Sequence, residues 1–131
     1  MINIFAVIVI AIIYWILGAT WYSKILFGNM WMESIGKTED DLEMKPISFI
    51  GSAITSFIMP LFLGILLELI GTINLINGIL VGLVVWFGFI ATFGLYDVLY
   101  QDKNVKTYII DILYHFVGLL IAGIILGLWV L

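Results

Sequence analysis

Four long apolar stretches, separated by shorter polar connections, dominate the chain. They cover residues 2–22, 46–70, 77–99 and 105–131. A bilayer hydrocarbon core is about 30 Å thick, and a helix needs about 20 residues to cross it. Each stretch is long enough. The pattern therefore predicts an all-α fold, an integral membrane four-helix bundle, with residues 1–131 forming a single membrane domain.

The longest connection, residues 24–45, is too polar to cross a membrane and too apolar to leave its surface. Apolar clusters at residues 25–27 and 30–32 alternate there with polar side chains. This pattern predicts an interfacial segment after the first span. Thr38 followed by three carboxylates predicts a helix start, and Pro46 suits the first position of the second span.

The composition supports a membrane protein and indicates its orientation. The chain is 64% hydrophobic and only 11% charged. All five of its cations are lysines, and they lie in the first and third connections, at Lys24, Lys37, Lys45, Lys103 and Lys106. The positive-inside rule places such connections in the cytoplasm. We therefore expect a multi-pass membrane protein, surrounded by membrane lipids, with both termini outside.

The same composition argues against several classes of function. The chain has no arginine and no basic patch, which argues against binding to nucleic acid. It has no cysteine and a single histidine, and no Ser-His-Asp order or H-E-x-x-H spacing is present. We therefore expect no enzymatic activity, no cofactor and no metal site.

The fourth stretch carries the strongest candidate for chemistry. Asp111 and His115 lie four residues apart, on one face of a helix, with Tyr108 and Tyr114 each three residues from Asp111. An ionised group at this depth is costly, so this face should meet protein or water. Asp111 and His115 in contact would form either a structural polar clasp, bonded to a tyrosine or threonine of a neighbouring helix, or a relay for protons or cations.

Asp97, at the cytoplasmic end of the third stretch, is a second candidate. In a hairpin of the third and fourth spans it would lie close to Tyr108 and Asp111, and two carboxylates there would make a mouth that attracts cations. The alternative is that Asp97 reaches the interface or pairs with Lys106. Its position in the sequence leaves both open.

Small residues four positions apart recur in the last three stretches. They are Ser52 and Ser56, Gly78 and Gly82, Gly118 and Ala122, and Gly123 and Gly127. Such spacing lets two helix backbones approach closely in a membrane. These faces either close the bundle within one chain or build an oligomer. Four helices enclose little space for a pore, so a transport function would favour a homo-oligomer.

The segment from Trp21 to Trp31 resembles a signature of a family of small prokaryotic membrane proteins of unknown function, the DUF1761 type. The matching residues are Trp21, Tyr22, Ser23, Phe27, Gly28 and Trp31. Lys24 stands where that family commonly has proline. The resemblance implies a four-helix protein of a prokaryotic cell membrane, and it carries over no catalytic or ligand-binding residue. We expect the four aromatic residues to form one cluster, with Gly28 permitting a sharp turn.

Two functions fit these patterns. The first is a small oligomeric channel or transporter for a cation or proton, with a path that uses Asp97, Asp111 and His115. The second is a non-transporting membrane scaffold that binds a lipid or a partner helix. The sequence does not indicate a substrate. Access of water or substrate to Asp111 would distinguish the two, because transport needs it and a scaffold does not.

Overall fold

The chain folds into four long helical spans, as predicted. The computed structural model describes residues 2–43 and 45–129, which contain helices and connections and no strand. The spans are α1 (Ile4–Trp21), α3 (Pro46–Ile70), the continuous run Leu75–Tyr100, and α6 (Val105–Leu128). Each is long and apolar enough to cross a membrane. The predicted all-α membrane fold is thus confirmed.

The third span is not a uniform α-helix. It consists of α4 (Leu75–Val85), a π-helical segment η2 (Trp86–Ala91) and α5 (Thr92–Tyr100). Two short helices follow α1 in the first connection, namely α2 (Gly28–Ser34) and the 3₁₀ turn η1 (Glu39–Asp41). Segments of π-helix are rare and often occur near functional sites.

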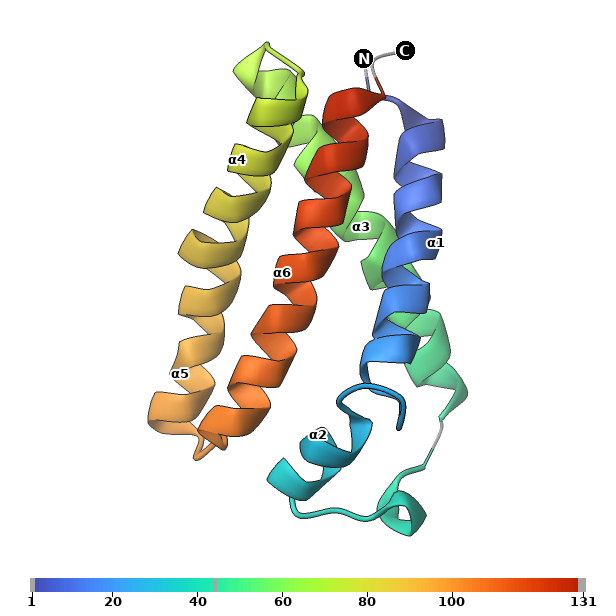
Figure 1. Cartoon of the computed structure of the whole chain (residues 1–131), viewed down its shortest axis with the longest axis vertical. Coiled ribbons are helices and arrows are strands. Elements are labelled where there is room, and N and C mark those ends of the chain that lie inside the picture. Colours follow the sequence, from blue (N-terminus) through green and yellow to red (C-terminus); the bar gives the residue numbers. More distant parts are fainter. Residues whose placement is uncertain (1, 44, 130–131) are drawn as a thin grey trace.

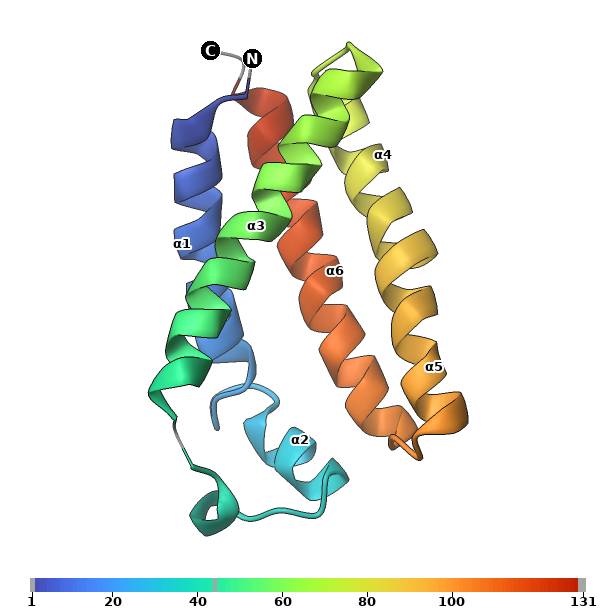
Figure 2. The same cartoon turned by 180° about the vertical axis from the view of Figure 1, so that it is seen from behind.

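The spans alternate in direction, so the chain has two distinct ends. Figures 1 and 2 show the termini and the α3–α4 connection at one end, and α2, η1 and the α5–α6 connection at the other. All five lysines therefore lie at the end opposite the termini. Helix α6 packs on both α1 and α4, and α1 also packs on α3.

Single residues determine where several helices begin or end. Asn74 accepts a hydrogen bond from the backbone N–H of Asn77 at 2.8 Å, which is an N-cap. The third span consequently begins at Leu75, two residues before its predicted start. Pro46 is the first residue of α3, as predicted. Gly71 caps the C-terminal end of α3 and has the left-handed conformation that favours glycine. The predicted end of the fourth span, at residue 131, lies outside the described residues.

The hydrophobic core fills the half of the bundle next to the termini. Ile10, Leu63 and Leu119, from three different spans, are almost completely buried there. Beside this core the backbones of α4 and α6 are in contact. Gly78 lies so close to Gly123 that a Cβ on Gly78 would overlap the carbonyl group of Gly123. Helix packing in lipid depends on such close approach. The glycines at 78, 82, 123 and 127 therefore close the bundle within one chain.

Contacts between residues of the first connection stabilise its turns. Ser23 accepts backbone hydrogen bonds from Leu26 and Gly28, so the turn after α1 forms without the family's proline. Lys24, in its place, pairs with Glu39 at 2.6 Å. The helix start predicted at Thr38 gives only the single turn η1. There the backbone N–H of Thr38 donates to Asp41 and holds the pKa of that carboxyl below its usual range.

Candidate functional site: a pocket between α5 and α6

A pocket of about 650 Å³ lies in the half of the bundle away from the termini. Its walls come from η2, α5 and α6, with one residue each from the turn after α1, from helix α2 and from the α5–α6 connection. Of the five candidate residues that the sequence indicates, four line it, namely Tyr108, Asp111, Tyr114 and His115. Two residues of the Trp21–Trp31 motif, Tyr22 and Trp31, line it too. Most of the lining is aromatic or aliphatic.

Asp111 is held by two partners from outside its helix. Tyr22, just after α1, donates a hydrogen bond of 2.6 Å to Oδ1 of Asp111. Lys103, in the α5–α6 connection, places Nζ 3.0 Å from Oδ2. The side chains of Lys103 and Asp111 are 29% and 26% exposed, so the ion pair is only partly buried. A lysine before the span thus supplies the counter-charge for a carboxylate inside it.

His115 bonds to α1 instead. Its Nδ1 lies 2.7 Å from the hydroxyl oxygen of the buried Tyr14. The spacing in the sequence predicts a pair in which Asp111 and His115 are in contact. In the structure each has its own hydrogen-bonding partner on or beside α1, one turn apart, although both line the pocket. The i, i+4 spacing placed them on one face, as expected, but antiparallel packing against α1 supplied the partners.

Two tyrosines and two glycines fix how α1 crosses α6. A Cβ on Gly118 would overlap the ring of Tyr14, and a Cβ on Gly18 would lie 2.8 Å from the hydroxyl oxygen of Tyr114. Tyr114 also donates to the backbone carbonyl of Tyr14 at 3.2 Å. Each helix therefore places a tyrosine over the other's glycine. This exchange fixes the position of His115 in the wall of the pocket.

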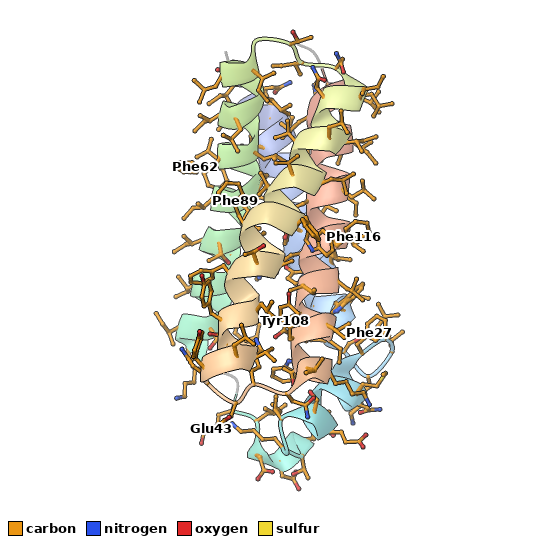
Figure 3. The ribbon with its side chains drawn as sticks, turned by 90° about the vertical axis from the view of Figure 1, so that its left-hand side faces the viewer. Phe27, Glu43, Phe62, Phe89, Tyr108 and Phe116 are labelled. Carbon is orange, nitrogen blue, oxygen red and sulfur yellow. The ribbon has the colours of Figure 1, made fainter. Side chains whose placement is uncertain are left out.

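The π-helical segment forms the opposite wall. Tyr108 donates to the backbone carbonyl of Ala91, the last residue of η2, and Figure 3 shows Tyr108 in the seam between α5 and α6. Trp86, the first residue of η2, donates through Nε1 to the carbonyl of Ile112 at 2.6 Å. Side chains thus bond η2 to α6 at both of its ends. The pocket wall is anchored rather than loosely packed.

Asp97 is not part of this arrangement. Among the residues that the structure describes, those that line the pocket do not include Asp97. Its backbone carbonyl accepts from Gln101 and Lys103 and so helps to form the α5–α6 turn. Lys103, whose backbone N–H takes part in this turn, pairs with Asp111. A mouth made of the carboxylates of Asp97 and Asp111 stays a prediction.

The aromatic residues of the motif form a cluster beside the end of α1, and two of them line the pocket. Trp21 lies 4.6 Å from Phe27 and Tyr22 lies 5.5 Å from Trp31, between ring centroids, and Tyr114 contacts both Trp21 and Tyr22. A Cβ on Gly28 would overlap the backbone of Ser23. The expected cluster and its tight glycine turn are present.

This cluster attaches the first connection to α6. Trp21 donates through Nε1 to the carbonyl of Ile110 at 3.0 Å, and Ser34 bonds Thr107 at 2.6 Å. Trp31 differs from Trp21. Its Nε1 is buried and has no acceptor among the described residues. A buried N–H without a partner costs about 1–3 kcal/mol.

Two of the important residues, Lys103 and Tyr14, are not among the candidates that the sequence pattern indicates. Lys103 bears there only on the orientation of the bundle. The unpartnered donor of Trp31, a motif residue, has no signal in the sequence. Tyr14 did have one, because Tyr-x-x-x-Gly occurs twice, at residues 14–18 and 114–118. In two antiparallel helices this repeat brings each tyrosine level with the other helix's glycine.

Comparison with known proteins assigns the chain to a family but identifies no ligand for the pocket. No three or more His, Cys, Asp or Glu side chains among the described residues are grouped to hold a metal ion. No curated protein and no solved structure matches the chain. Residues 5–127, which include every residue that lines the pocket, match the family described as "Protein of unknown function (DUF1761)". The chain is therefore a member of the DUF1761 family, a multi-pass membrane protein with four spans.

Proposed function

We propose that the chain binds an amphipathic, lipid-like molecule, which enters the pocket between α5 and α6 from the membrane. The observation that carries this proposal is a gradient of polarity along the pocket. Lys103 and Asp111 lie toward the α5–α6 connection, whereas Phe89 and Ile90 lie farther into the span. A membrane lipid has the same order of polar and apolar parts along the bilayer normal.

The pocket is also open in the right direction. Phe89 and Phe93 line it, yet they are 67% and 76% exposed on the outer face of a membrane span. An acyl chain can therefore reach the pocket without crossing water. The volume of about 650 Å³ falls within the range of about 300–1,000 Å³ that is usual for small-molecule sites.

A second candidate, a small oligomeric channel or transporter for a cation or proton, is favoured by one observation. Polar side chains continue from Lys103 through Asp111 to His115 and Tyr14. At 1.5 Å per residue His115 lies about 15 Å along α6 from Val105, near the middle of a bilayer. Beyond it the core is apolar and α4 touches α6. A complete path would need a second copy of the chain, and Asp111→Asn would abolish pH-dependent flux into liposomes.

Photo-crosslinking tests lipid binding directly. The purified chain would be placed in nanodiscs that contain phospholipids with a diazirine near the start of one acyl chain, and crosslinked residues would be mapped by peptide mass spectrometry. We expect crosslinks to concentrate on Phe93 and Ile112. Phe62, 57% exposed on α3, serves as the reference for ordinary contact with bulk lipid.

A variant that fills the pocket gives the control. Ile112→Trp adds a large side chain to the pocket wall and should reduce crosslinking at Phe93, whereas Leu80→Trp, on the exposed face of α4, should not. Equal labelling of Phe93 and Phe62, unchanged by Ile112→Trp, would refute the proposed function.

A further inference from the structure

The polar end of the pocket presents one positive and one negative side chain. Lys103 Nζ and Asp111 Oδ2 are 3.0 Å apart, and both residues line the pocket. A lysine ammonium has three N–H donors, and a carboxylate has about four acceptor positions. The contacts with each other and with Tyr22 leave further positions on both groups. Each group therefore retains hydrogen-bonding capacity for a ligand.

This pair discriminates by charge. A purely anionic head would be attracted to Lys103 and repelled by Asp111 at nearly the same distance, so the two effects would largely cancel. The same holds, with signs reversed, for a purely cationic head. A headgroup with an anionic oxygen on one side and a cationic nitrogen on the other can contact Lys103 through the oxygen and Asp111 through the nitrogen. Neither charge of the headgroup is then left against a like charge.

The aromatic residues supply a matching environment for the cationic part of such a head. The rings of Tyr22, Trp31, Tyr108 and Tyr114 line the same pocket as Asp111, and aromatic faces attract alkylammonium groups. The donor for an anionic oxygen is thus Lys103, and the sites for a cation are Asp111 and the rings.

We propose that the pocket selects the headgroup of a zwitterionic phospholipid, with its phosphate at Lys103 and its ammonium group at Asp111. This inference rests on the proposed function, because it names the class of lipid for the same pocket. Nζ of Lys103 and Oδ2 of Asp111 are 3.0 Å apart, so a phosphate and an ammonium group of one headgroup can lie side by side against them. The acyl chains then lie along Phe89 and Phe93.

Competition among lipids with identical acyl chains tests the headgroup. Crosslinking at Phe93 by the diazirine lipid would be measured in mixed micelles at a fixed mole fraction of competitor. The competitors are a phosphatidylethanolamine, a phosphatidylcholine, a phosphatidylglycerol and a diacylglycerol. We expect the two zwitterionic lipids to compete at least about threefold better than the other two, the size of effect that a partly exposed ion pair supports.

Three variants separate selection by charge from mere stability. Asp111→Asn leaves Lys103 without its opposing carboxylate, so phosphatidylglycerol should rise to match or exceed the zwitterionic lipids. Lys103→Gln should lower competition by all three phospholipids toward that of diacylglycerol. Lys106→Gln removes a nearby lysine that does not line this pocket and should leave the ranking unchanged.

The outcomes distinguish the two proposals. If all four lipids compete equally, or phosphatidylglycerol competes best in the unaltered chain, the zwitterion inference is wrong while lipid binding stands. An unaltered ranking in Asp111→Asn would also contradict the inference. If no lipid competes and crosslinking at Phe93 is no greater than at Phe62, the proposed function itself is wrong.

Discussion

The ring of Tyr14 on α1 occupies the space that Gly118 on α6 leaves by having no side chain. The relationship is reciprocal, since Tyr114 on α6 lies against Gly18 on α1. Tyr14 in turn bonds His115, and Tyr114 contacts Tyr22 of the family motif. The crossing of two helices thus determines where the polar side chains of the pocket stand.

Adding one methyl group at this crossing should therefore destabilise the bundle. Gly118→Ala forces the buried ring of Tyr14 to move, and overpacking of this kind costs roughly 1–3 kcal/mol. Gly51→Ala is the matched control, because a Cβ there meets nothing within 4 Å, and alanine favours a helix by up to about 1 kcal/mol. Unfolding by SDS titration in mixed micelles would measure both. Equal stability of the two variants would contradict the proposed packing.

The bond between Tyr22 and Asp111 should contribute measurably to stability. A hydrogen bond to a charged group is worth about 1.5–3 kcal/mol, although double-mutant cycles in a membrane protein average about 0.6 kcal/mol. Tyr22→Phe should cost an amount between these limits, whereas Tyr100→Phe, on a side chain that is 78% exposed, should cost nothing. A cycle with Asp111→Asn checks the pairing. Strictly additive losses would show that the two residues do not interact.

The two motif tryptophans should respond differently to the same substitution. Trp21→Phe removes a donor that bonds the carbonyl of Ile110, whereas Trp31→Phe removes a buried donor that has no acceptor among the described residues. In lipid-free detergent we expect Trp21→Phe to lose about 1–3 kcal/mol more than Trp31→Phe. Chemical unfolding of both variants measures the difference. A larger loss for Trp31→Phe would show that its N–H is bonded in the folded chain.

The fold was predictable from the sequence because membrane spans are encoded by length and hydropathy alone. Each apolar stretch became a span, and Pro46 began α3 as expected. The predicted bounds of the spans were wrong where a single side chain determines the end of a helix. Asn74 caps the third span at Leu75, and hydropathy does not register a single cap. The π-helical segment at residues 86–91 also has no hydropathy signal, because hydropathy does not distinguish a π-helix from an α-helix.

The site was predictable only along one helix. Spacing placed Tyr108, Asp111 and His115 in a common region, and all three line the pocket. Their partners were not predictable, because they depend on which helix packs against that face and in what direction. Lys103 shows the difficulty most clearly. Orientation rules count it as a cytoplasmic charge, and only the conformation of the α5–α6 turn brings it to Asp111 rather than to water.

The orientation of the bundle remains a prediction that experiment can check directly. All five lysines lie at one end and both termini at the other, and the positive-inside rule then places the termini outside. A single cysteine introduced as Asn104→Cys should be shielded from an impermeant maleimide in intact cells and become reactive after permeabilisation. A reporter fused after the C-terminus that is active only outside the cytoplasm should be active. Labelling of Asn104→Cys in intact cells would reverse the topology, and would place the pocket, with its ion pair, in the outer leaflet.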